Sequence, residues 1–217
     1  INWSSMKMID NKRNHFIKYL KMMGDKYSGQ TYEAKAVLLG NAQVGKTCLV
    51  NRGVDGIFSD HTKETIGACY SEKLFVFNSQ TFKLQLWDAA GQERFKTLVP
   101  LYFRNAVVAC IVFSVDSRES FNCVDDWLVT LRESKNDIPF IVLVGTKIDL
   151  IDDRKVTREE GEKKAEELEF TGYFETSSRT GEGVETFFNF VGKKAYEYST
   201  TKVKTVPVDK GQNLNGD

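Results

Sequence analysis

Apolar residues in the central part of the chain fall into short runs of the kind that form buried strands. Three runs are almost wholly apolar, as in strands covered on both faces: residues 34–39, 107–115 and 140–144. Residues 70–77 and 82–87 are two further strand-like segments, and the polar residues 78–81 between them predict a hairpin connection. A short last strand is expected at residues 173–175.

Helical periodicity separates most of these strands. One helix is expected to start near Lys46, and three more are expected at residues 120–131, 157–168 and 184–198. Thr157 and Glu160 have the spacing of a capping box, in which two side chains bond backbone N–H groups at the start of a helix. Strands that alternate with helices predict an α/β fold. We expect a mixed, mostly parallel six-stranded sheet with helices on both faces and one antiparallel edge from the hairpin.

Both ends of the chain differ from this alternating part. Residues 1–30 carry apolar side chains at helical spacing with lysine and arginine between them, followed by a glycine-containing linker. Such a basic amphipathic helix can pack on the main domain or lie on a membrane surface. Beyond about Ser199 the polar tail has nothing to bury, so we expect residues 199–217 to be disordered. One domain then covers residues 31–198.

Composition fits a well-packed globular domain with added ends. Hydrophobic residues make up 41% and charged residues 28% of the 217 residues. The 30 basic and 30 acidic side chains cancel, so no overall field favours nucleic acid, and we expect no such partner. The four cysteines lack metal-ligand spacing such as C-x₂-C, and we expect reduced thiols in the core of a cytoplasmic protein. No signal peptide is recognisable, and no apolar run reaches the roughly 18–20 residues of a membrane-spanning helix.

A phosphate-binding loop follows the first strand. Residues 40–47 read GNAQVGKT and match the pattern G-x-x-x-x-G-K-[ST] between a strand and a helix. Glycines let backbone N–H groups point at phosphate oxygens, the helix N-terminus favours anions, and a lysine adds an ammonium. The loop predicts a nucleoside triphosphate without identifying the base. The expected phosphate-contacting residues are Asn41, Ala42, Gln43, Val44, Gly45, Lys46, Thr47 and Cys48.

Four further motifs follow in order. They read KETIG at residues 63–67, WDAAGQERF at 87–95, GTKID at 145–149 and ETSSR at 175–179. With the phosphate loop, they resemble the five-motif set of the Ras superfamily of small GTPases. The Thr-Ile-Gly element, KLQLWD at residues 83–88 and RFKTL at 94–98 are most similar to the Rab branch. The resemblance covers about residues 33–198 and implies a G domain.

The resemblance implies a guanine site and a magnesium site. An aspartate at 149 can accept hydrogen bonds from the guanine N1–H and amino group, a pair of donors that adenine lacks. Lys147 would lie along the base, and Phe58 would cover its face. The other residues implied at the base are Thr146, Ser177, Ser178 and Arg179. The resemblance places Thr47, Thr65 and Asp88 at Mg²⁺, Gly91 at the γ-phosphate and Gln92, as the catalytic residue, at the attacking water.

These roles imply a GTP/GDP-cycling switch that acts in vesicle-mediated membrane trafficking. Loss of the γ-phosphate would release Thr65 and Gly91 and let the segments around them relax. The implied partners are a guanine-nucleotide exchange factor, a GTPase-activating protein and effector proteins, which would read Tyr70, Trp87 and Tyr102. Ordinary core packing also favours aromatic residues at those positions. We expect a monomer on the cytosolic face of endomembranes.

Several departures from the family pattern keep other interpretations open. Ala42 would lie beside the γ-phosphate, which predicts slow hydrolysis and leaves room for a GTP-binding scaffold that hardly turns over. Thr146 replaces an asparagine, as in the Rho branch, and is expected to lose amide bonds to the phosphate loop; a Ras- or Rho-type signalling GTPase is therefore an alternative. Rab proteins usually end in prenylated cysteines, yet no cysteine follows Cys123. Either the tail is truncated or attachment uses a partner or the basic residues 7–21, and the start at Ile1 leads us to expect missing upstream residues.

Overall fold

The computed structural model describes residues 32–60, 65, 67–89, 102–134 and 137–203. Within them six strands form one sheet with the order β2-β3-β1-β4-β5-β6. The strands are β1 (Tyr32–Leu39), β2 (Ala68–Phe77), β3 (Gln80–Ala89), β4 (Ala106–Ser114), β5 (Phe140–Thr146) and β6 (Gly172–Thr176). Only the β2–β3 pair is antiparallel. The expected mixed, mostly parallel sheet is confirmed.

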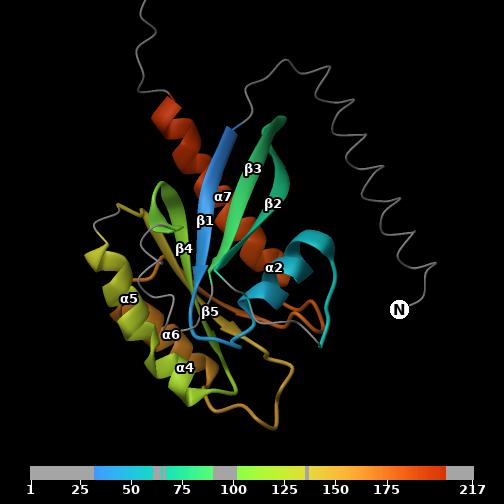
Figure 1. The fold of residues 1–217 in the computed structure, drawn as a ribbon, viewed down its shortest axis with the longest axis vertical. Helices are drawn as coiled ribbons and strands as arrows, with labels where there is room; N and C mark the ends of the chain where they lie inside the picture. The colour runs from blue at the N-terminus through green and yellow to red at the C-terminus, as the bar shows by residue number, and fades with distance from the viewer. Residues whose placement is uncertain (1–31, 61–64, 66, 90–101, 135–136, 204–217) are drawn as a thin grey trace, which may run out of the picture.

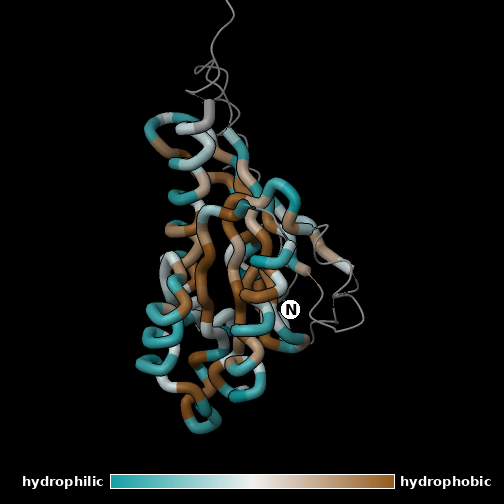
Figure 2. Tube along the Cα trace, turned by 90° about the vertical axis from the view of Figure 1, so that its left-hand side faces the viewer, coloured by the Kyte–Doolittle hydropathy of each residue, from teal (hydrophilic) through white to brown (hydrophobic). Residues whose placement is uncertain are grey.

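Helices cover both faces of this sheet (Figure 1). They are α2 (Lys46–Asp55), α4 (Arg118–Asn122), α5 (Val124–Glu133), α6 (Arg158–Glu167) and α7 (Val184–Val203). Apolar side chains of α2 and α7 pack on one face, and those of α4, α5 and α6 pack on the other. In Figure 2 the hydrophobic residues gather in the central strands, while hydrophilic residues lie mainly on helices and loops at the periphery. This two-sided burial explains why β4 is apolar at nearly every position.

The sheet brings the motif residues to one edge. Parallel strands end at the same edge of a sheet, so the loops after β1, β5 and β6 meet there. The phosphate loop follows β1, which lies between β3 and β4 in the middle of the sheet. Asp88 lies near the end of β3, so its carboxylate reaches the same edge. Segments far apart in the sequence thus converge on one site.

Three local predictions were wrong at their boundaries. The hairpin turn is only Asn78 and Ser79, both with positive φ, and the next two residues already belong to β3. The helix expected at residues 120–131 is two helices that meet at Cys123, and the first begins before its expected start because Ser117 caps α4 by accepting from the Ser120 N–H. Helix α7 runs to Val203, five residues beyond its expected end at residue 198. Residues 199–203 are therefore helical, not disordered.

Other expectations have mixed outcomes. The capping box of Thr157 and Glu160 is confirmed at the start of α6. Cys110 is buried as expected, but Cys69 is exposed because it lies on the edge strand β2, so the prediction of a core thiol was wrong there. Among the described helices, none has the length and apolar character to cross a membrane. The N-terminal extension 1–30 and residues 204–217 lie outside the described part of the chain.

Candidate functional site

The phosphate loop presents a buried lysine at the start of α2. Lys46 is 6% exposed, and its Nζ donates hydrogen bonds to the carbonyl oxygens of Gly40 and Asn41, each at 2.8 Å. The Gly45 N-cap has a φ of 93°, and the first turn of α2 has neither a side-chain cap nor an acidic residue. The uncapped N–H groups and the lysine make this end of the helix a site for an anion. Burial lowers the pKa of Lys46 to about 8, against the opposing charge of Asp88.

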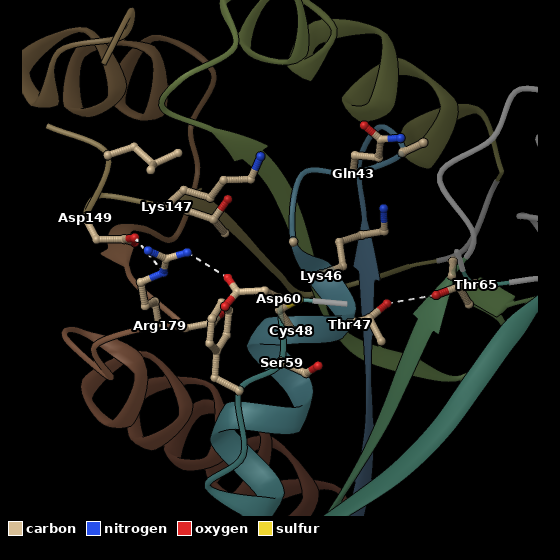
Figure 3. A pocket seen from close by; sticks show the side chains of 17 residues that line it. Gln43, Lys46, Thr47, Cys48, Ser59, Asp60, Thr65, Lys147, Asp149 and Arg179 are labelled. Carbon is tan, nitrogen blue, oxygen red and sulfur yellow. Dashed lines mark hydrogen bonds and ion pairs between the residues drawn. The ribbon is translucent and has the colours of Figure 1, made fainter. Parts of the chain in front are cut away.

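Three oxygen-bearing side chains meet beside Lys46. Thr47 Oγ1 donates to Asp88 Oδ2 at 2.5 Å and lies 2.8 Å from Thr65 Oγ1, as Figure 3 shows for the two threonines. Asp88 is 2% exposed, and its Oδ1 has no hydrogen-bond partner among the residues that the structure describes. Burial raises the pKa of Asp88, opposed by the Thr47 hydrogen bond and the Lys46 charge.

This oxygen set fits a hard divalent cation. Hydroxyl and carboxylate oxygens are ligands that Mg²⁺ accepts, usually together with waters and phosphate oxygens. A cation near the free Asp88 Oδ1 would stabilise the charged carboxylate against its burial. In the described part of the chain, no three His, Cys, Asp or Glu side chains form an alternative metal cluster.

The other end of the site holds the base-motif residues. Ser177 Oγ donates to Asp149 Oδ1 at 2.6 Å and thereby orients the carboxylate. Lys147 Nζ lies 3.3 Å from Asp116 Oδ2. Although burial acts to raise the pKa of Asp116, a hydrogen bond from Ser114 and the Lys147 charge lower it. Both functional side chains of the motif at residues 145–149 are thus held by neighbours.

Besides the bonds of Thr47, two further hydrogen bonds tie the phosphate loop to neighbouring elements. Thr146 Oγ1 lies 2.5 Å from the Val44 carbonyl oxygen and 3.0 Å from that of Phe113, and it donates to these acceptors. The sequence predicted a loss of amide bonds at Thr146, but its hydroxyl reaches a loop carbonyl directly and so keeps a tie to the phosphate loop. Trp127 on α5 donates from Nε1 to Asn41 Oδ1 at 2.8 Å. The sequence interpretation missed this second tie, for which no local motif exists.

A cavity of about 340 Å³ joins the two ends of the site, a size within the range of small-molecule pockets. Its lining includes Lys46 and Thr47 at one end and Lys147 and Asp149 at the other (Figure 3). The cavity can therefore take an elongated ligand with an anionic end and a hydrogen-bonding end. This is the shape and polarity of a nucleotide.

Comparison with known proteins agrees with this geometry. A family model described as the Ras family matches residues 35–197. The chain belongs to the Ras family. Members of this family are GTPases that bind guanine nucleotides and Mg²⁺.

Two relatives of this Ras-family chain come from Dictyostelium discoideum. The chain is 37% identical over 189 residues to the Ras-related protein Rab-5A, an alignment that covers 85% of the chain and 94% of the relative. It is 41% identical over 162 residues to the Ras-related protein RabJ, and this alignment covers 75% of the chain and 63% of the relative. The chain is a small GTPase of the Ras superfamily with similarity to Rab proteins.

Most of the site residues predicted from the sequence line the cavity of this Ras-family chain. Those that do are Ala42, Gln43, Gly45, Lys46, Thr47, Cys48, Phe58, Thr65, Thr146, Lys147, Asp149, Ser178 and Arg179. Asn41, Val44, Asp88 and Ser177 do not line it and instead bond residues around it, as described above. Gly91 and Gln92 lie outside the described residues. Lining residues that the sequence interpretation missed are Ser59, Asp60, Ala89 and Leu150.

The aromatic trio also comes together. The rings of Tyr70 and Trp87 have centroids 5.5 Å apart, and those of Trp87 and Tyr102 lie 6.4 Å apart. Tyr70 is 48% exposed, so the trio presents part of its surface to solvent. Lys35 Nζ lies 4.4 Å from the Trp87 ring centroid, a cation–π contact that holds the indole in place. Contact with partners through these residues stays a prediction.

Proposed function

We propose that this chain is a Rab-like molecular switch that binds GTP and GDP with Mg²⁺ and hydrolyses GTP. The supporting observation is one cavity with buried Lys46 at one end and Asp149 with Lys147 at the other. A buried ammonium suits the β- and γ-phosphates. A fixed carboxylate suits a base with two adjacent donors, which guanine has and adenine lacks.

The chain's own residues would divide the work of hydrolysis. Thr47, Thr65 and Asp88 would hold Mg²⁺, which when bound supplies positive charge to the phosphates during transfer. By resemblance, the Gly91 N–H would contact the γ-phosphate and Gln92 would orient the attacking water. By resemblance, loss of the γ-phosphate would release Thr65 from the site and let the segment around it relax.

The names of the relatives support a role in vesicle-mediated membrane trafficking. Partners would be an exchange factor, a GTPase-activating protein and effectors, with the chain acting as a monomer on the cytosolic face of endomembranes. Residues 31–198 would form the G domain, with residues 1–30 as a basic extension. The partly exposed trio of Tyr70, Trp87 and Tyr102 supports effector contact beside the switch segments. Unchanged effector binding by a Tyr102→Ala protein with normal nucleotide affinity would contradict that contact.

Nucleotide binding and single-turnover hydrolysis test the proposed function. A fluorescent GDP analogue should bind at least about a hundredfold more tightly than the matching ADP analogue, since a carboxylate left unpaired disfavours the wrong base. Preloaded GTP should be hydrolysed when Mg²⁺ is present and should remain intact when EDTA removes the Mg²⁺. Equal affinity for both bases, or no hydrolysis of bound GTP, would contradict the proposal.

A slow or non-hydrolysing scaffold is the second candidate, favoured by Ala42. Its side chain is exposed and lines the phosphate part of the cavity, where the family pattern has glycine or serine. A methyl group there would crowd the γ-phosphate and an incoming arginine. Ala42→Gly should therefore speed single-turnover hydrolysis. A variant no faster than the parent would show that Ala42 does not limit the rate.

A further inference from the structure

Arg179 joins two walls of the cavity at the base end. Its Nη2 donates to Asp60 Oδ1 at 2.7 Å, and its Nε lies 3.7 Å from Asp149 Oδ2. Its Cζ lies 5.8 Å from the centroid of the Phe58 ring. Figure 3 shows the guanidinium between the two carboxylates, with a dashed line to each. A residue of the loop after β6 thus contacts the segment after α2, which is 119 positions away in the chain.

All four of these residues line the cavity. Phe58 and Asp60 come from the segment that follows α2, Asp149 follows β5, and Arg179 follows β6. The Nε–Asp149 distance is too long for a hydrogen bond, so this contact is an ion pair that leaves the carboxylate able to accept from a base. The Asp60 contact is a short charge-assisted hydrogen bond. The guanidinium therefore interacts more strongly with the Asp60 carboxylate than with the Asp149 carboxylate.

We propose that the Asp60–Arg179 ion pair holds the walls of the base site together around bound guanine nucleotide and slows its release. This inference rests on the proposed function. Arginine suits the position because its planar fork can donate to one carboxylate while it faces a second and lies over an aromatic ring. Release of the nucleotide requires the Phe58 and Asp60 segment to separate from the loop after β6, and that separation breaks the pair.

Exposure sets the size of the effect. The side chains of Arg179 and Asp60 are 57% and 62% exposed, whereas Asp149 is 15% exposed. Exposed pairs are weak, and salt screens them increasingly as the screening length falls from about 10 Å at 0.1 M to about 3 Å at 1 M. We therefore expect release to become about two- to fivefold faster without the pair, as for other exposed ion pairs.

The experiment measures release of a fluorescent GDP analogue from the full chain, chased with excess GDP, at low and high KCl. The variants are Arg179→Ala, Asp60→Asn, the double variant and Arg179→Lys. Asp152→Asn is the matched control, because Asp152 is an exposed carboxylate of the loop after β5 that does not line the cavity. At low salt both single variants should release the analogue faster and the control should match the parent. Arg179→Lys should fall between parent and Arg179→Ala, because it keeps the charge without the fork.

The double variant and the salt dependence of the release rate distinguish the proposed Asp60–Arg179 ion pair from a general loosening of the loop. The double variant should release the analogue no faster than Arg179→Ala, since the Asp60–Arg179 pair is already lost in that single variant. High KCl should bring the parent to the rate of the variants and leave the variants almost unchanged. Additive effects, a change in only one single variant, or equal rates throughout would overturn the bridge while the proposed function stands. A parent chain that does not retain the GDP analogue would overturn both.

Discussion

The phosphate end and the base end of the cavity are built in opposite ways. At the phosphate end, Lys46 and Asp88 are 6% and 2% exposed, and most contacts come from one continuous loop. At the base end, the Asp60–Arg179 pair is largely exposed, and the lining comes from three separate segments. Buried charges interact strongly and cost much when unpaired, whereas exposed pairs contribute little. We therefore expect substitutions at the phosphate end to cause large losses of nucleotide affinity and substitutions at the base end to cause small ones.

Removing the buried ammonium should have the largest effect. Lys46→Ala takes the cation from the phosphates and leaves buried Asp88 without its neighbouring positive charge. We expect GDP affinity to fall about a hundredfold, equivalent to about 3 kcal/mol. Equilibrium titration with a fluorescent GDP analogue measures this, with Lys163→Ala on exposed α6 as the control. A loss as small as that expected for Arg179→Ala would remove the contrast between the two ends.

Glycine substitutions compare the backbone at the two ends. A Cβ on Gly40, whose φ is 140°, would lie 2.1 Å from the Val112 carbonyl oxygen. Gly40→Ala should therefore lower the free energy of unfolding by about 2–3 kcal/mol. Gly56 lies before the base-end segment with a φ of 71°, and no described atom lies within 4 Å of its added Cβ. Gly56→Ala should cost only about 1 kcal/mol from backbone strain. Urea denaturation measures both, and equal losses would contradict the prediction.

Thr146 tests whether the two ends are coupled. Its hydroxyl is buried and donates to carbonyl oxygens of Val44 and Phe113. Thr146→Ala should lower the free energy of unfolding by about 1–2 kcal/mol and weaken GDP binding, because buried carbonyl groups lose their donor. Thr146→Ser keeps the hydroxyl and should behave like the parent. If stability falls while GDP affinity is unchanged, Thr146 supports the fold without coupling the ends.

Glu160 lies away from both ends of the cavity, so its substitution should have the smallest effect on nucleotide binding and serves as a reference. Hydrogen bonds from Arg118 and from the Thr157 N–H lower the pKa of Glu160 from 4.5 to about 2. A lowered pKa means that the charged carboxylate favours the folded chain, so this contribution is present above pH 4.5 and is lost as the pH falls toward 2. Glu160→Gln should flatten the acid dependence of stability in that interval and leave GDP affinity at pH 7 unchanged. Glu162→Gln, which removes another exposed ion pair of the same helix, is the matched control.

Sequence alone determined the sheet, the phosphate loop and most residues of the site. The strand and helix patterns depend on which faces of each element are buried. The motif GNAQVGKT works through contacts within one short segment. The motifs and their order resemble those of one family, and strands that end at one edge of a parallel sheet bring the motif loops together. Local composition failed at Ser199, where α7 continues to Val203, and at Cys123, where α4 and α5 meet.

Tertiary structure decided the contacts between distant segments. The replacement at Thr146 predicted a lost tie, yet the close approach of β5 to the phosphate loop lets a shorter side chain reach Val44. The Trp127–Asn41 bond and the Asp60–Arg179 pair join residues 86 and 119 positions apart, and in each case one partner, Trp127 or Asp60, lies outside every motif. Such contacts depend on where the packed elements place each side chain, which no periodicity along the chain encodes. The proposed ligand follows from the sequence motifs, and how strongly it is held depends on contacts that only the fold creates.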